Sequence, residues 1–165
     1  MTTLRPLALA VLVLAAAPAA AQGRHPGPIG LTGFADLGAG GAVAGSKADA
    51  TNGGMFEAEA GLGYDLGQGL RPELGLLVGL APSAYLGLRP GVRYLFPDMP
   101  FSFRLALDLA APGGSWRMRG LLGGAGAELR LTDLLSVFGE ADVVVPVASK
   151  AGFPFLLRAG VGFRL

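Results

Sequence analysis

The chain has 165 residues, enough for one domain with its own core. Hydrophobic residues make up 52% of it and charged residues only 15%, against about 25% charged in ordinary soluble domains. The formal net charge of +1 excludes the strongly basic surface typical of nucleic-acid binding. The absence of cysteine excludes disulfides and thiolate metal sites.

The first 21 residues have the pattern of a secretory signal peptide. Arg5 lies in a short polar start, residues 7–17 form an apolar run, and Ala19-Ala20-Ala21 is a cleavage site of the Ala-x-Ala kind. The apolar run is too short for a membrane helix, which needs about 20 residues. We therefore expect signal peptide 1–21, a leader 22–28 that holds the only histidine, His25, and a barrel domain 29–165.

From residue 30 onward, apolar and polar residues alternate with a period of two, which is typical of β-strands. The clearest segment is Phe56–Leu66, where every second residue is apolar and the others are acidic or glycine. In chain order the pattern predicts eight strands: 30–44, 56–66, 71–80, 85–96, 101–109, 121–131, 135–147 and 153–165.

The predicted connections fall into two groups. Residues 67–69, 97–100 and 132–133 are tight turns, whereas residues 45–54, 111–115 and 148–152 are mostly longer loops, with 81–83 short. This predicts an up-and-down antiparallel meander with two unlike ends. Eight such strands close into a barrel, which removes the exposed sheet edges.

The charged residues of these strands share one face, so they all point either into the barrel or out of it. They comprise nine carboxylates and seven arginines: Asp36, Glu57, Glu59, Asp65, Arg71, Glu73, Arg89, Arg93, Arg104, Asp108, Glu128, Arg130, Glu140, Asp142, Arg158 and Arg164. A soluble, lipocalin-like barrel would turn these residues to water and bind a small apolar ligand inside. A membrane barrel would turn them inward and its apolar face to lipid.

Three observations favour the membrane barrel. Arginine and carboxylate are nearly balanced on the charged face without lysine, which suits an interior ion-pair network. The same face holds glycines that make room for arginine side chains: Gly61, Gly63, Gly75, Gly79, Gly87, Gly91, Gly160 and Gly162. Aromatic residues gather at both strand ends, as in the two interfacial girdles of a membrane barrel.

The last strand carries a polar residue, a glycine and two hydrophobic residues at Arg158, Gly160, Phe163 and Leu165. This spacing resembles the C-terminal signature of bacterial outer-membrane β-barrels, and the whole chain resembles the small eight-stranded OmpA/OmpX-type barrels. The resemblance implies recognition by the barrel-assembly machinery and location in the outer membrane. It also implies that the long loops face outward and the short turns face the periplasm.

Two places interrupt the alternation. Pro90 lies in mid-strand, where it cannot donate a sheet hydrogen bond, so a bulge or local break is expected. Arg117 and Arg119 are out of phase with Glu128 and Arg130, which a bulge within residues 120–124 would explain. Alternatively, the two arginines lie at headgroup level and contact lipopolysaccharide phosphates.

Candidate catalytic groups are missing from the pattern. His25 lies in the leader, no serine or carboxylate has a histidine partner, and no spacing of carboxylates suggests a metal or cofactor site. A filled eight-stranded interior also leaves little room for a pore. We therefore predict a non-enzymatic structural or surface-interaction protein, in contact with outer-membrane lipid and lipopolysaccharide, whose surface partner the sequence does not identify. A soluble ligand-binding barrel and, less favoured, a lipid-modifying enzyme are the alternatives.

Overall fold

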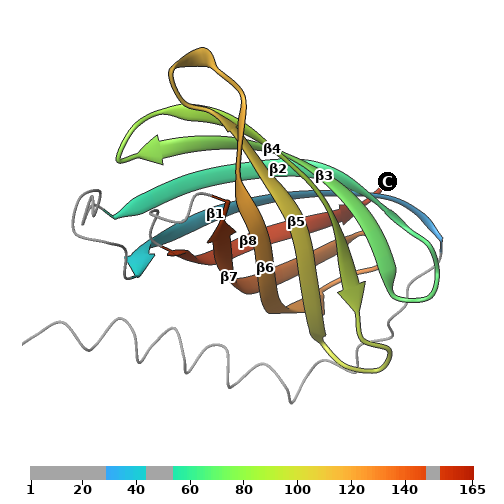
Figure 1. The fold of residues 1–165 in the computed structure, drawn as a ribbon. Coiled ribbons are helices and arrows are strands. Elements are labelled where there is room, and N and C mark those ends of the chain that lie inside the picture. The colour runs from blue at the N-terminus through green and yellow to red at the C-terminus, as the bar shows by residue number, and fades with distance from the viewer. Residues whose placement is uncertain (1–28, 44–53, 148–152) are drawn as a thin grey trace, which may run out of the picture.

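The computed structural model describes residues 29–43, 54–147 and 153–165; the predicted signal peptide, leader, His25 and two of the predicted loops lie outside these ranges. The described chain is built from eight strands and one short 3-10 turn, η2, at Pro112–Gly114 (Figure 1). The strands are β1 Gly30–Val43, β2 Met55–Asp65, β3 Leu70–Ala81, β4 Tyr85–Leu95, β5 Phe101–Ala111, β6 Arg117–Arg130, β7 Leu135–Pro146 and β8 Phe153–Arg164.

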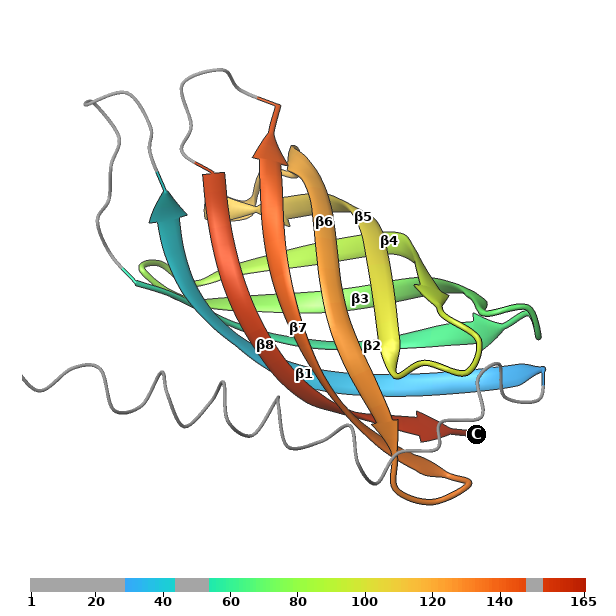
Figure 2. The same ribbon diagram turned by 90° about the horizontal axis from the view of Figure 1, so that it is seen from below.

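Each strand pairs with its sequence neighbours in antiparallel fashion, and β8 pairs with β1 to close the barrel. The closing register runs from Thr32 opposite Arg164 to Val43 opposite Phe153, so the seam is paired along nearly its whole length. Figure 2 shows β1 and β8 side by side. The predicted fold class, an eight-stranded antiparallel up-and-down barrel, is confirmed.

The apolar face of the strands points outward. Leu74, Leu86 and Leu105, which would line the cavity of a soluble barrel, are 54%, 54% and 65% exposed. The charged residues of the same strands are mostly buried. The structure thus decides between the two orientations that the alternation allowed. The soluble, ligand-carrying alternative has the wrong face inside.

Strands of 11–14 residues are long enough to cross a bilayer, which takes about 9–11 tilted residues. Exposed aromatic residues lie at both ends of this apolar wall. Tyr64, Tyr94, Phe101, Phe103 and Phe163 lie toward the short turns, and Phe56, Trp116 and Phe153 lie toward the longer loops. This distribution matches the two aromatic girdles at the lipid–water boundaries of membrane barrels.

Both predicted irregularities are visible in the strand pairing. Between β4 and β5 the pairing stops at Arg89 and Pro90 and then resumes in the same register, so Pro90 causes a local break without a bulge. In β6 the register shifts at Arg119, which has no opposite residue on β5. This bulge lies just before residues 120–124, and β6 begins four residues earlier than predicted because pairing continues through it.

The β5–β6 hairpin, with η2 at its tip, projects beyond the neighbouring strand ends (Figure 1). A third irregularity, a register shift between β2 and β3 that leaves Leu80 unopposed, lies at the same end. Within the described ranges, no helix is long and apolar enough to span a membrane.

Candidate functional site

The interior of the barrel holds the charged residues that the alternation grouped on one face. Fifteen of the sixteen predicted members form ion pairs with one another, and Arg130 forms none with the described residues. Because side chains alternate along each strand, every strand contributes to this interior. We call the paired residues the interior network.

Arg158 of β8 lies at the centre of the network and is fully buried. Its guanidinium contacts Asp36 at 2.6 Å, Asp142 at 2.6 Å, Glu57 at 2.8 Å and Glu59 at 3.1 Å. These carboxylates come from β1, β7 and β2. One arginine thus joins four strands across the closing seam, a role that suits the planar, multidentate guanidinium.

Arg89 of β4 makes the matching contacts from the opposite wall. It donates to Glu57 at 2.9 Å, Glu59 at 3.0 Å and Asp108 at 3.1 Å, and none of these side chains is exposed. Glu57 and Glu59 therefore each bridge Arg89 and Arg158. The break in β4–β5 pairing occurs at Arg89 itself, where side-chain ion pairs link the two strands instead.

A second group lies between the centre and the short turns. Arg93 donates to Glu73 at 2.8 Å and also pairs with Glu140. Arg104 pairs with Glu59 and lies 3.4 Å from the second oxygen of Glu73. Two rings complete the packing: Phe34 lies 5.6 Å from Arg104 and Phe138 lies 5.5 Å from Arg93, both measured from the guanidinium carbon to the ring centroid.

The inward glycines make this packing possible, though only some of them face an arginine as predicted. A Cβ on Gly63 would lie 3.0 Å from Arg71. On Gly160, it would lie 2.6 Å from both Asp36 and Phe138. At Gly75 and Gly79 the space is filled by Glu59 and Tyr85. The room therefore serves carboxylates and aromatic rings as well as guanidinium groups.

At the long-loop end the bulge turns Arg119 into the barrel mouth. Its guanidinium lies 4.7 Å from the Tyr85 ring centroid, 3.5 Å from Asp108 and 3.7 Å from Glu57. Arg119 is thus placed with the interior network rather than on the outer wall, unlike the headgroup position considered for it. Arg117 lies opposite Ala110 near the tip of the β5–β6 hairpin and is exposed, so the predicted lipopolysaccharide contact stays a prediction for that residue.

Tyr85 is a network member that the sequence pattern did not single out. Its hydroxyl hydrogen-bonds to Glu57, and its ring stacks under Arg119. The signal was present in its parity, since Tyr85 lies four residues before Arg89 and so shares its face. The same parity rule identifies Ser102, which is within reach of Arg93, and Ser136, which donates to Glu128 at 2.9 Å.

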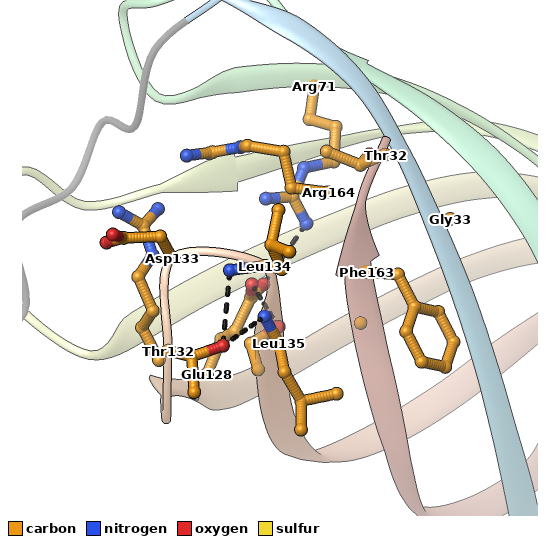
Figure 3. A pocket seen from close by; sticks show the side chains of 13 residues that line it. Thr32, Gly33, Arg71, Glu128, Thr132, Asp133, Leu134, Leu135, Phe163 and Arg164 are labelled. Carbon is orange, nitrogen blue, oxygen red and sulfur yellow. Dashed lines mark hydrogen bonds and ion pairs between the residues drawn. The ribbon is translucent and has the colours of Figure 1, made fainter.

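The short-turn end has a small open pocket of about 20 Å³, which we call the short-turn mouth (Figure 3). Its lining includes Thr32, Arg71, Glu128, Arg130, Leu134 and Arg164. Arg71 pairs with Asp65 at 2.7 Å and with Glu128 at 3.1 Å, whereas Arg164, among the described residues, pairs with Asp65 alone, at 3.1 Å. A volume of this size holds about one water molecule.

The four residues of the predicted C-terminal assembly signal divide between the two faces of β8. Arg158 and Gly160 point inward and pack against β1, where Gly160 lies opposite Asp36. Phe163 and Leu165 point outward and are 43% and 71% exposed. The inward pair is therefore fixed by closure of the barrel, and the outward pair belongs to the apolar wall.

In the interior network, the charges of the arginines and the carboxylates neutralise one another. Arg89 and Arg158 each contact several carboxylates, so their charges are paired within the described residues. Within the described ranges, no group of three acidic or histidine side chains is arranged to hold a metal ion. The arrangement can fill the barrel and hold its strands in register.

Comparison with known proteins identifies the fold through solved structures alone, because no family model and no curated protein matches the chain. Neisserial surface protein A shares 20% identity, with a TM-score of 0.58 over 82% of this chain and 97% of that one. The N-terminal β-barrel domain of Pseudomonas aeruginosa OprF shares 13% identity, with a TM-score of 0.58 over 84% and 100%. A de novo designed transmembrane β-barrel shares 13% identity, with a TM-score of 0.53 over 87% and 100%. The chain therefore has the fold of the small eight-stranded membrane barrels.

Proposed function

We propose that this protein is a closed outer-membrane β-barrel that acts as a structural or surface-interaction protein and not as an enzyme. The observation that carries the proposal is the orientation of the two strand faces. Arg89, Arg104 and Arg158 are at most 3% exposed, whereas the outward wall is built of leucine, valine, alanine and aromatic residues. A barrel with such a wall is stable only where lipid covers it.

The interior supports the non-enzymatic part of the proposal. Every arginine at its centre is bound to carboxylates, and the Glu57 and Glu59 pair is shared between Arg89 and Arg158. Catalysis requires a nucleophile or base that reaches a substrate. Here the carboxylates Glu57 and Glu59 are buried and paired with Arg89 and Arg158, which keeps them from reaching a substrate. The same filling argues against a pore.

A role at the cell surface is proposed from the asymmetry of the two ends. The projecting β5–β6 hairpin lies at one end of the barrel, where the strands that flank the predicted loops 45–54 and 148–152 also end, and tight turns close the other end. In folds of this kind, recognition is carried by variable loops on a rigid scaffold. One solved structure with this fold is named a surface protein, which agrees with the proposal.

The predicted partners are part of this proposal. Export would require the signal peptide, and the C-terminal signal of Arg158, Gly160, Phe163 and Leu165 would be read by the barrel-assembly machinery before the barrel closes. At the outer rim, exposed Arg117 lies beside Trp116, also exposed, at the level expected for lipid headgroups. Arg117 is thus the residue proposed to contact lipopolysaccharide phosphate.

Cell fractionation tests the proposal. The cells express the chain without a C-terminal tag, and an antibody detects the protein in each fraction. We expect the protein in the outer membrane, and we expect the unboiled and boiled protein to migrate differently on a gel because the closed barrel resists detergent. Recovery in the soluble periplasm would contradict the proposal. A change in lipid A mass on expression would instead favour the lipid-modifying alternative.

A further inference from the structure

The short-turn mouth differs from the barrel centre in the use of its arginine donors. In the centre, Arg89 uses Nε, Nη1 and Nη2 on three carboxylates. In the mouth, Arg164 uses only Nη2, on Asp65, and its Nε is buried without a hydrogen-bond partner in the described structure. Arg130, also in the lining, forms no ion pair with the described residues. The mouth therefore holds guanidinium donors that its own carboxylates do not use.

A further donor faces the same pocket. Thr32 is 6% exposed and lines the mouth, and its hydroxyl oxygen has no partner among the described groups. A buried hydroxyl without a partner costs free energy unless water or a ligand satisfies it. Figure 3 shows Thr32 and Arg164 on the same side of the pocket.

The acidic residues of the lining do not compete for these donors. Glu128 accepts from Ser136 through Oε1 and from Arg71 through Oε2, so both of its oxygens are engaged. Asp133, the other lining carboxylate, is exposed at the turn between β6 and β7. Among the lining residues, three arginines thus face one buried and one exposed carboxylate.

We propose that the short-turn mouth binds one side-chain carboxylate of an acidic peptide segment. The guanidinium fork matches a carboxylate, as Arg71 demonstrates by holding Asp65 through both Nε and Nη2. The pocket of about 20 Å³ has room for one water-sized group, so a carboxylate would enter oxygen first while its peptide stays outside the mouth. Leu134, which lines the pocket and is 66% exposed, offers apolar contact to the residues that flank such a carboxylate.

This inference rests on the proposed function in one respect: the outer-membrane location places the short-turn mouth, and hence the bound peptide, in the periplasm. The binding itself is a property of the folded barrel in a micelle. Failure to bind and failure to reach the outer membrane are therefore separate results.

The test uses the mature chain in detergent micelles with ¹⁵N-labelled arginine. A capped Leu-Glu-Leu peptide is titrated at constant ionic strength, and the arginine Nε–Hε signals are followed by NMR. We expect saturable shifts of the Arg130 and Arg164 signals, no such shifts with the Leu-Gln-Leu peptide, and at least fivefold weaker binding after Arg130→Gln. Arg130→Gln removes no ion pair of the described structure, so it should fold.

Arg117→Gln is the matched control, because this exposed arginine lies at the opposite end of the barrel. It should leave the affinity unchanged. Thr32→Val, which replaces the hydroxyl with a methyl group of similar size, should weaken binding severalfold. The proposal is overturned by an absence of saturable shifts, by equal shifts with the glutamine peptide, or by unchanged binding in Arg130→Gln. Equal affinity for free acetate would also overturn it, since it would indicate an ion site without peptide docking.

Discussion

Arg158 and Arg130 are both inward-facing strand residues, yet their surroundings are opposite. Arg158 is 3% exposed and contacts four carboxylates from three other strands. Arg130, near the short turns, is half-buried and has no ion pair in the described structure. Depth in the barrel, and not residue type, therefore decides how completely a charge must be paired, because the desolvation cost of a charge rises with burial.

Among the variants that compare the centre of the barrel with its ends, Arg158→Leu is expected to lose the most stability. The change removes the arginine partner of Asp36 and Asp142, whereas Glu57 and Glu59 keep Arg89, and the uncompensated buried charge costs about 3–5 kcal/mol. Urea unfolding in lipid vesicles measures this loss of stability, with the folded fraction determined on a gel from the different migration of unboiled and boiled protein. Arg117→Leu, at an exposed position near the tip of the β5–β6 hairpin, is the control. Equal stability of the two variants would contradict the assigned role of Arg158.

A second test adds volume instead of removing charge. Gly160→Ala places a Cβ 2.5 Å from the Ala35 carbonyl oxygen and 2.6 Å from Asp36 and Phe138, so the seam must shift, at a cost of about 1–3 kcal/mol. Gly123→Ala is the control, since its new Cβ would lie 4.0 Å from its nearest neighbour, Leu105. The same unfolding experiment compares them, and a loss of stability in both would point to glycine backbone effects.

A smaller effect is expected at the long-loop mouth. Arg119 is only partly buried, and its contacts with Asp108 and Glu57 are longer than hydrogen bonds. Arg119→Gln should therefore cost about 1 kcal/mol, most of it from the contact with the Tyr85 ring. The unfolding midpoint in urea measures it. A cost as large as that of Arg158→Leu would show that depth does not control pairing.

The smallest effect is expected from Arg130→Gln. Without an ion pair in the described structure, the side chain should contribute less than about 0.5 kcal/mol to stability. Its unfolding curve should overlay that of the unmodified protein. A clear destabilisation would mean that Arg130 is held by a partner within the protein, which would also remove the argument for its free donors.

The alternation of the sequence predicted the eight strands and their two faces because the side-chain period of a strand is fixed by backbone geometry. Strand ends agreed closely except in β6, where Arg119 bulges and changes the phase that Leu121 and Glu128 established. A bulge depends on the neighbouring strand as well as on its own residues. Parity alone therefore located it only to within a few positions.

The sequence pattern could not predict which arginine pairs with which carboxylate inside the barrel. Parity places Arg158 and Asp36 on the same face, but their contact depends on how far β8 is shifted along β1 when the barrel closes. The stagger also decides which glycine faces which side chain, so Gly75 accommodates Glu59 and not an arginine. Faces are local properties of a strand, whereas partners are set by closure.

Tryptophan quenching shows which of the two strand faces meets lipid. Leu105 is 65% exposed on the outward wall, and Trp116 is the only native tryptophan. Leu105→Trp in a Trp116→Phe background should be quenched strongly by lipids brominated in their acyl chains and weakly by aqueous iodide. Strong quenching by iodide with none from brominated lipid would place this face in water and contradict the account.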